Sequence, residues 1–210
     1  MTRFRYASMS RRAALTAAAL ATMAAVAGCS GSKGGAAEGD MGLGAAEGAK
    51  VTVVEYASVT CSHCAAWNAE VWPELKAKYV DNKKIRFVFR EFPTPPQDIA
   101  VAGFLIARCA GEDKYFDVVH DIMASQTEWQ AGVNPRTTLF RAAAAAGLSE
   151  SQTQACISDK SAIEAMEKRI RAGIDAGVTG TPTFLVNGVK AVDSSLAGLS
   201  QVIDAELAKK

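Results

Sequence analysis

The residues of this sequence best suited to chemistry are two cysteines, Cys61 and Cys64, with Ser62 and His63 between them. At positions i and i+3 their sulfur atoms lie on one face of a helical turn, close enough to bond. The start of a helix carries partial positive charge and unpaired N–H groups, which stabilise a thiolate, and His63 can add a positive charge or a donated hydrogen bond. Because the thiolate is the attacking species in disulfide exchange, the spacing predicts thiol–disulfide chemistry.

Two other roles are open to this cysteine pair. A structural zinc site commonly uses four ligands, arranged as two Cys-x-x-Cys pairs or as one such pair with two histidines. This chain has one such pair, with His120 far along the sequence and Cys109 and Cys156 distant from each other. The second alternative is a pair of structural cysteines that closes a small inert loop. We predict redox chemistry without a bound metal and without an organic cofactor.

The segments around the pair predict a strand–helix–strand unit. Residues 50–57 are β-branched and apolar, which indicates a buried strand, and residues 84–92 indicate a second strand. Between them, residues 61–79 carry apolar side chains about one helical turn apart, so we expect a helix that is kinked at Pro73. This order favours parallel strands with a right-handed crossover. The cysteines then lie where the first strand gives way to the helix.

The rest of the chain divides into a long helical stretch and a return to strands. Residues 93–177 show only helical patterns. Strand patterns return at 183–186 and 189–192, and Asn187-Gly188 between them is a strong hairpin signal. A last helix is expected over residues 195–207. A strand-containing unit is therefore predicted to be interrupted by a helical insertion.

Four short motifs are spread over these elements: Val54-Glu55-Tyr56, Cys61-Ser62-His63-Cys64, Glu91-Phe92-Pro93 and Gly180-Thr181-Pro182-Thr183-Phe184. Together they resemble the DsbA-type thiol–disulfide oxidoreductases, over about residues 41–207. The resemblance implies an α/β protein, a thioredoxin fold with an inserted all-helical subdomain. Residues 50–92 and 178–210 would form the thioredoxin-like domain, and residues 93–177 would form the helical insertion.

The same resemblance assigns roles to individual residues. Cys61 would be the exposed nucleophile that forms mixed disulfides, and Cys64 would be the resolving partner. Pro182 would be a cis-proline facing the cysteines, with Thr181 presenting its backbone to an extended substrate segment. Glu55 would be a buried acid that relays protons to the resolving thiol. The alternatives are a trans turn at Pro182 and an exposed carboxylate at Glu55.

The direction of the reaction depends on finer features. The sequence has Ser62 where the best-known oxidases of the family have proline, but His63 in the next position still fits an oxidising pair. Threonine before the proline, as at Thr181, also occurs in isomerase-like relatives. No N-terminal dimerisation domain is recognised, so we expect a monomeric oxidase that transfers its disulfide to newly exported proteins. The alternatives are a disulfide isomerase, a dedicated reductase, or a chaperone-like binder of unfolded chains.

Cys109 and Cys156 lie in the predicted helical insertion. In an oxidising compartment two unpaired cysteines beside an active oxidase would be hazardous. We therefore predict a structural Cys109–Cys156 disulfide, and the alternative is two buried free cysteines that behave as small hydrophobic residues. His120 falls on an apolar helix face and is expected in the core. Trp129 is expected in a loop, where it either borders a substrate groove or packs on the insertion.

The N-terminus predicts export and a lipid anchor. Residues 1–28 contain four arginines and no acid, followed by an apolar run too short and too rich in alanine for a convincing membrane span. The run ends in Val26-Ala27-Gly28-Cys29, which resembles the lipobox of bacterial lipoproteins, so Cys29 would carry the lipid. Arg11-Arg12 resembles a twin-arginine signal, with general secretion as the alternative route. Residues 29–49 are rich in Gly, Ala and Ser and predict a flexible tether.

The charge argues against one class of partner, and the N-terminal signal sets the expected location. The 210-residue chain has a net charge of +1, and without residues 1–28 it has 19 basic residues against 22 acidic ones. No basic stripe is visible, so nucleic acid is not an expected partner. The expected location is extracytoplasmic, in a periplasm or at a cell surface, with the bilayer contacted through Cys29. The expected redox partner is a quinone-linked membrane protein that reoxidises the enzyme.

Overall fold

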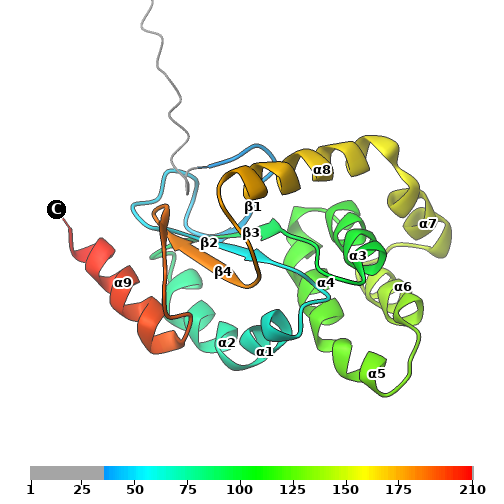
Figure 1. The fold of residues 1–210 in the computed structure, drawn as a ribbon, viewed down its shortest axis with the longest axis horizontal. Coiled ribbons are helices and arrows are strands. Elements are labelled where there is room, and N and C mark those ends of the chain that lie inside the picture. Colours follow the sequence, from blue (N-terminus) through cyan, green and yellow to red (C-terminus); the bar gives the residue numbers. More distant parts are fainter. Residues whose placement is uncertain (1–35, 210) are drawn as a thin grey trace, which may run out of the picture. The chain divides into compact units, whose positions relative to one another are not determined.

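A mixed sheet of five strands lies at the centre of the computed structural model, which describes residues 36–209. The strand order is β1-β3-β2-β4-β5, with β2 and β3 parallel and the other neighbouring pairs antiparallel. Figure 1 shows the sheet between α8 on one side and α1, α2 and α9 on the other. The strands are β1 (Met41–Gly44), β2 (Thr52–Ala57), β3 (Arg86–Glu91), β4 (Thr183–Val186) and β5 (Val189–Lys190).

The predicted strand–helix–strand unit is confirmed. The crossover from β2 to β3 contains α1 (Ser62–Glu70), α2 (Trp72–Leu75) and a π-helical turn (Lys76–Val80). The helix is interrupted at Val71, directly before the first turn of α2, which contains Pro73. Proline is tolerated in the first turn of a helix but cannot continue the hydrogen bonding of a preceding one, which explains the break.

Alternate side chains of β2 point to opposite faces of the sheet. Val53 packs in the larger hydrophobic core, with the aromatic rings of Trp67, Phe87 and Phe184. Val54 and Tyr56 pack in a smaller cluster on the other face. Tyr56 lies close to α8 there, since a methyl group added at Gly173 would lie 3.0 Å from its ring. Both faces of β2 are therefore covered, which explains its almost continuous apolar sequence.

The stretch between β3 and β4 is helical, as predicted, and contains six helices. They are α3 (Gln97–Cys109), α4 (Glu112–Ala124), α5 (Gln126–Gln130), α6 (Pro135–Ala145), α7 (Glu150–Ser158) and α8 (Lys160–Asp175), and α9 (Leu196–Ala208) follows the last strand. Trp129 lies in α5 and not in a loop, so that expectation was wrong. The predicted Cys109–Cys156 disulfide is present and joins α3 to α7, with the Cα atoms 6.0 Å apart.

The prediction that residues 29–49 form a flexible tether was wrong for their last part. Residues 41–44 are strand β1, paired with the outer edge of β3. Met41 is buried opposite Phe89, and Gly42 fits where a side chain would collide with Arg86. A four-residue strand with two glycines has no readable periodicity, because its stability comes from the edge that it covers.

The other N-terminal predictions concern residues outside the described part of the chain. The signal peptide, Arg11-Arg12 and Cys29 all precede residue 36. Within residues 36–209, none of the helices has the length and apolar character needed to cross a bilayer.

Candidate active site

The two cysteines of the Cys-x-x-Cys motif lie at the start of α1, immediately after the loop that follows β2. Cys61 is the N-cap residue, with an extended backbone, and its sulfur accepts the backbone N–H of Cys64 at 3.4 Å. Both are free thiols; Cys61 is 9% exposed and Cys64 is completely buried. Cys61 is thus less exposed than the nucleophile that the resemblance implied, and Cys64 lies entirely inside.

The two sulfur atoms differ in protonation. The pKa of Cys61 is lowered to about 5, and the largest cause is the hydrogen bond from the Cys64 thiol. Burial opposes this shift, while the Thr181 side chain and the backbone N–H groups of Cys64 and His63 contribute to it. The pKa of Cys64 is raised, because its thiol donates to Cys61, because it is buried, and because Glu55 is nearby. At neutral pH the pair is therefore a thiolate at Cys61 and a thiol at Cys64.

The loop before β4 lies against the nucleophile. The Thr181–Pro182 peptide bond is cis, as predicted. The carbonyl oxygen of Thr181 lies 3.5 Å from the Cys61 sulfur, although the two residues are 120 positions apart in sequence. β4 pairs with β2 from Tyr56 to Val53, and this pairing brings the loop to the cysteines. Pro95–Pro96, a second cis bond, was not predicted from the sequence.

Glu55 lies inside the molecule, in β2. It is 4% exposed, so the alternative of an exposed carboxylate is wrong. Burial, followed by the negative charge of Cys61, raises the pKa of Glu55 to about 8. Glu55 in turn contributes to the raised pKa of Cys64. A buried acid that titrates near neutral pH beside a buried thiol is suited to accepting and returning a proton.

The two histidines have different surroundings. The His63 side chain is exposed at the start of α1, and its backbone N–H contributes to lowering the pKa of Cys61. His120 packs against the rings of Trp72 and Phe116, and burial lowers its pKa to about 4. His120 is therefore a neutral core residue, as expected. Its ring contacts are with Trp72 and Phe116 and not with the cysteines.

Gln126 was not identified from the sequence, although it contacts the active-site loop directly. It is the first residue of α5 and is buried. Its side-chain nitrogen donates to the carbonyl oxygens of Val59 at 2.8 Å and Cys61 at 3.2 Å. A glutamine in a polar stretch, three residues before a tryptophan, has no distinguishing local pattern, so only the tertiary contact reveals it.

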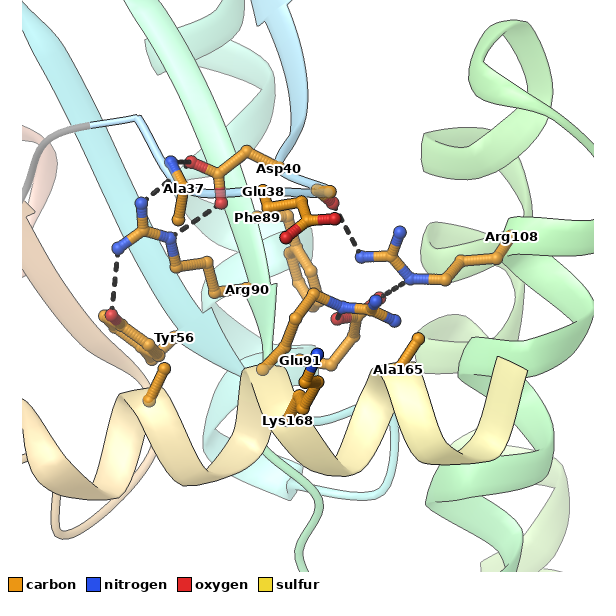
Figure 2. Close-up of a pocket in the computed structure, with 13 residues that line it drawn as sticks. Ala37, Glu38, Asp40, Tyr56, Phe89, Arg90, Glu91, Arg108, Ala165 and Lys168 are labelled. Atoms are coloured by element: carbon orange, nitrogen blue, oxygen red, sulfur yellow. Dashed lines mark hydrogen bonds and ion pairs between the residues drawn. The ribbon is translucent and has the colours of Figure 1, made fainter. Parts of the chain in front are cut away.

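A cavity of about 480 Å³ lies elsewhere, between the segment 37–40, the sheet and α8 (Figure 2). None of the residues that line it belongs to the cysteine site. Five of its charged side chains pair with one another: Glu91 binds Arg108 and Arg169, and Arg90 binds Asp40. The chemistry of the reactive pair lies outside this cavity. Within the described range, no group of three or more His, Cys, Asp or Glu side chains is placed to hold a metal ion.

Comparison with known proteins agrees with this site. Residues 36–205 match the family described as Thioredoxin. The chain belongs to the thioredoxin family. A Rickettsia bellii protein named "Putative protein-disulfide oxidoreductase" is 36% identical over 169 residues, which cover 80% of this chain and 64% of that protein. Against the curated relatives from Rickettsia, this chain spans less than two thirds of their length.

Solved structures identify the branch of the family. The crystal structure of Wolbachia pipientis alpha-DsbA1 has a TM-score of 0.73 and 27% identity, covering 82% of this chain and 93% of that chain. A protein-disulfide isomerase from Novosphingobium aromaticivorans has a TM-score of 0.68 and 25% identity, and the match covers 83% of this chain and 100% of that chain. The resemblance to DsbA-type proteins, and the thioredoxin fold that it implies, are confirmed.

Proposed function

We propose that this protein is an extracytoplasmic thiol–disulfide oxidase that donates a Cys61–Cys64 disulfide to exported proteins. The observation that carries the proposal is the pairing of a low-pKa sulfur at the start of α1 with a buried, high-pKa one. A stabilised Cys61 thiolate favours the reduced form of the pair. The corresponding disulfide is therefore readily reduced, which makes it an oxidant.

The reaction consists of two exchanges. A client thiolate attacks the Cys61 sulfur, the Cys61–Cys64 bond breaks, and Cys64 leaves as a thiolate that takes a proton from Glu55. A second client thiolate then attacks the client sulfur of the mixed disulfide, and Cys61 leaves as a thiolate. The client loses two electrons and gains a disulfide, while the enzyme gains those electrons as one thiolate and one thiol. A low pKa at Cys61 makes it a good leaving group in the second step.

Thr181 and Pro182 are the proposed substrate contact. The Thr181 carbonyl faces the reactive sulfur, in a loop that leads into a sheet strand. An extended client segment passing this loop could pair with its backbone while presenting a cysteine to Cys61. His63, exposed beside Cys61, is proposed to assist the exchange.

The remaining partners follow from the redox balance and from the N-terminal sequence. Each cycle leaves two electrons on the enzyme, which a quinone-linked membrane protein would remove. Cleavage before Cys29 and lipidation of that residue would hold a monomer at the membrane through the short segment before β1. Replacement of Cys29 with serine should release the protein from membranes and leave its thiol chemistry unchanged. Retention of the variant in the membrane fraction would contradict the anchor.

Equilibration with glutathione tests the proposed direction. The redox state of Cys61 and Cys64 would be followed by alkylation and mass spectrometry of the peptide that contains them. We expect a reduction potential closer to that of DsbA, about −120 mV, than to that of thioredoxin, about −270 mV. A value near that of thioredoxin would favour a reductase. Faster reaction with scrambled than with fully reduced client protein would favour an isomerase.

A further inference from the structure

The helical insertion contacts the active-site loop through one buried side chain. The Gln126 amide nitrogen, at the start of α5, donates to two main-chain carbonyls on either side of Thr60, those of Val59 and Cys61. With the amide reversed, its oxygen would face two carbonyl oxygens, so only this orientation makes hydrogen bonds. The Cys61 carbonyl also accepts the first helical hydrogen bond of α1, from Ala65. Gln126 therefore holds the loop at the point where α1 begins.

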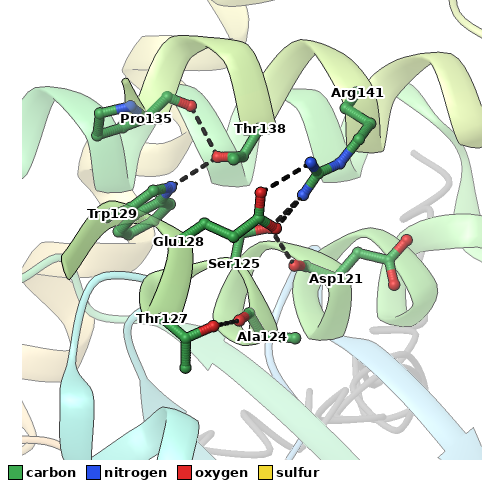
Figure 3. A network of polar contacts seen from close by, with 9 residues as sticks. All are labelled: Asp121, Ala124, Ser125, Thr127, Glu128, Trp129, Pro135, Thr138 and Arg141. Atoms are coloured by element: carbon green, nitrogen blue, oxygen red, sulfur yellow. Dashed lines mark hydrogen bonds and ion pairs between the residues drawn. The ribbon is translucent and has the colours of Figure 1, made fainter. Parts of the chain in front are cut away.

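Helix α5 is itself fixed to α6 on its other side (Figure 3). The Trp129 ring nitrogen donates to the Thr138 hydroxyl at 2.6 Å, and Thr138 donates to the Pro135 carbonyl at 2.9 Å. Arg141 forms a forked ion pair with Glu128. With only five residues, α5 would not be stable by itself. These contacts give Gln126 a fixed position from which to bind the loop.

We propose that Gln126 is a positioning residue that holds the segment from Val59 to Cys61 in the conformation that favours a thiolate at Cys61. The inference rests on the proposed thiol–disulfide chemistry and adds that the insertion, besides covering the core, sets the redox properties of the pair. The thiolate depends on the N–H groups at the start of α1, which point at the sulfur only while Cys61 keeps its N-cap conformation.

This effect acts through geometry and not through charge. Among titratable side chains, Cys64 acts on the pKa of Cys61, and Cys61 in turn acts on the pKa of Glu55. The contribution of His63 to the pKa of Cys61 comes from its backbone. Gln126 is neutral and does not contact the sulfur. Removal of its two hydrogen bonds would leave the Val59 carbonyl oxygen without a donor and the Cys61 carbonyl with Ala65 alone, and would loosen the loop. The loosened loop would stabilise the thiolate less well.

The test is Gln126→Met, which keeps nearly the same volume and removes both donors. The matched control is Gln130→Met, at the exposed end of the same helix. The thiolate absorbance of reduced protein would be titrated against pH, and the glutathione equilibrium constant would be measured separately. For Gln126→Met we expect the midpoint of Cys61 to rise by about one pH unit. The oxidising equilibrium constant should fall about tenfold, which is about 30 mV.

The outcomes separate this inference from the proposed function. If Gln126→Met and Gln130→Met both titrate as the wild type does, the positioning role is wrong and the proposed function is untouched. If the wild type itself lacks a low-pH thiolate, the proposed function fails, whatever the variants do. Should Gln126→Met not fold, Gln126→Asn, whose amide is too short to reach Val59, takes its place with the same expected direction.

Discussion

Two cysteines within one helical turn have opposite protonation preferences because each determines that of the other. The Cys64 thiol donates to the Cys61 sulfur, which favours a thiolate at Cys61 and disfavours one at Cys64. Burial adds to the difference, since Cys64 is fully enclosed while Cys61 reaches the surface. Of the two sulfur atoms, the one that is less enclosed is therefore also the better nucleophile and leaving group.

The contribution of the Cys64 thiol to the low pKa of Cys61 can be tested by removing that thiol. In Cys64→Ala the largest cause of the low pKa at Cys61 is absent, so the thiolate absorbance should titrate well above the wild-type midpoint of about 5. Cys64→Ser keeps a hydroxyl donor and should titrate between the two. Cys61→Ser, which lacks the nucleophile, gives the baseline for the thiolate absorbance. An unchanged midpoint in Cys64→Ala would assign the low pKa to the helix start alone.

Glu55 should lower stability at neutral pH. Its folded pKa of about 8 exceeds the value of 4.5 for a free carboxyl group, so the unfolded chain loses the proton first, and stability falls as the pH rises from 4.5 to 8. The cost at pH 7 is of the order of 3 kcal/mol. We expect Glu55→Gln to unfold at higher urea concentration than the wild type at pH 7 and at a similar concentration at pH 4.5. Its reaction with a client thiol should be slower. Equal urea midpoints at pH 7 would contradict a buried, protonated Glu55.

At the scale of elements, a buried ion-pair cluster connects the sheet to the insertion. Glu91 of β3, 2% exposed, binds Arg108 of α3 and Arg169 of α8, and accepts a hydrogen bond from Tyr115 of α4. Glu91→Gln keeps the shape but leaves two arginines without their partner, so unfolding should cost about 3 kcal/mol less. Glu167→Gln, which breaks an exposed pair with Arg171 on α8, is the control and should change stability by less than about 0.5 kcal/mol. Equal effects of the two changes would show that burial does not matter here.

The disulfide is the second connection between elements. It links α3 to α7 across 47 residues, and the chain-entropy relation gives about 4 kcal/mol as its upper contribution. We expect the double variant Cys109→Ala, Cys156→Ala to unfold at lower urea concentration with an unchanged thiolate titration. The urea comparison is best made with Cys61 and Cys64 both replaced by serine, which prevents disulfide exchange, and the thiolate titration is made with both cysteines in place. An unchanged urea midpoint would mean that strain in the folded state offsets the entropic gain.

The sequence predicted those elements and residues whose signals are local or belong to a motif. β2, the broken α1–α2 helix, the helical insertion and the cis bond at Pro182 all follow from periodicity, proline chemistry or a known pattern. β1 was missed because only the edge of β3 makes Met41–Gly44 a strand. Gln126 was missed because its importance depends on the packing of α5 against a loop more than 60 residues earlier. Tertiary contacts of this kind leave no mark in the local sequence.

For the whole molecule, the low pKa of Cys61 links the proposed oxidising power to folding stability. The reduced folded protein gains stability from its thiolate relative to an unfolded chain, in which the thiol titrates near 9. The gain is complete above pH 9 and is lost as the pH falls through about 5. The disulfide form has no such thiolate and gains nothing. We therefore expect the oxidised protein to be the less stable form at neutral pH, and the proposed transfer of the disulfide to a client would remove that difference.

This link gives a prediction for thermal unfolding. At pH 7 the thiolate should contribute about 1–2 kcal/mol once solvent screening at the accessible sulfur is allowed for. The reduced protein should then melt roughly 2–8 °C above the oxidised one, and the difference should shrink towards pH 5. Calorimetry of both forms in a Glu55→Gln background removes the opposing titration of that carboxyl group. A melting difference that does not change between pH 5 and pH 8 would separate stability from the Cys61 thiolate, and the oxidising power would then require another source.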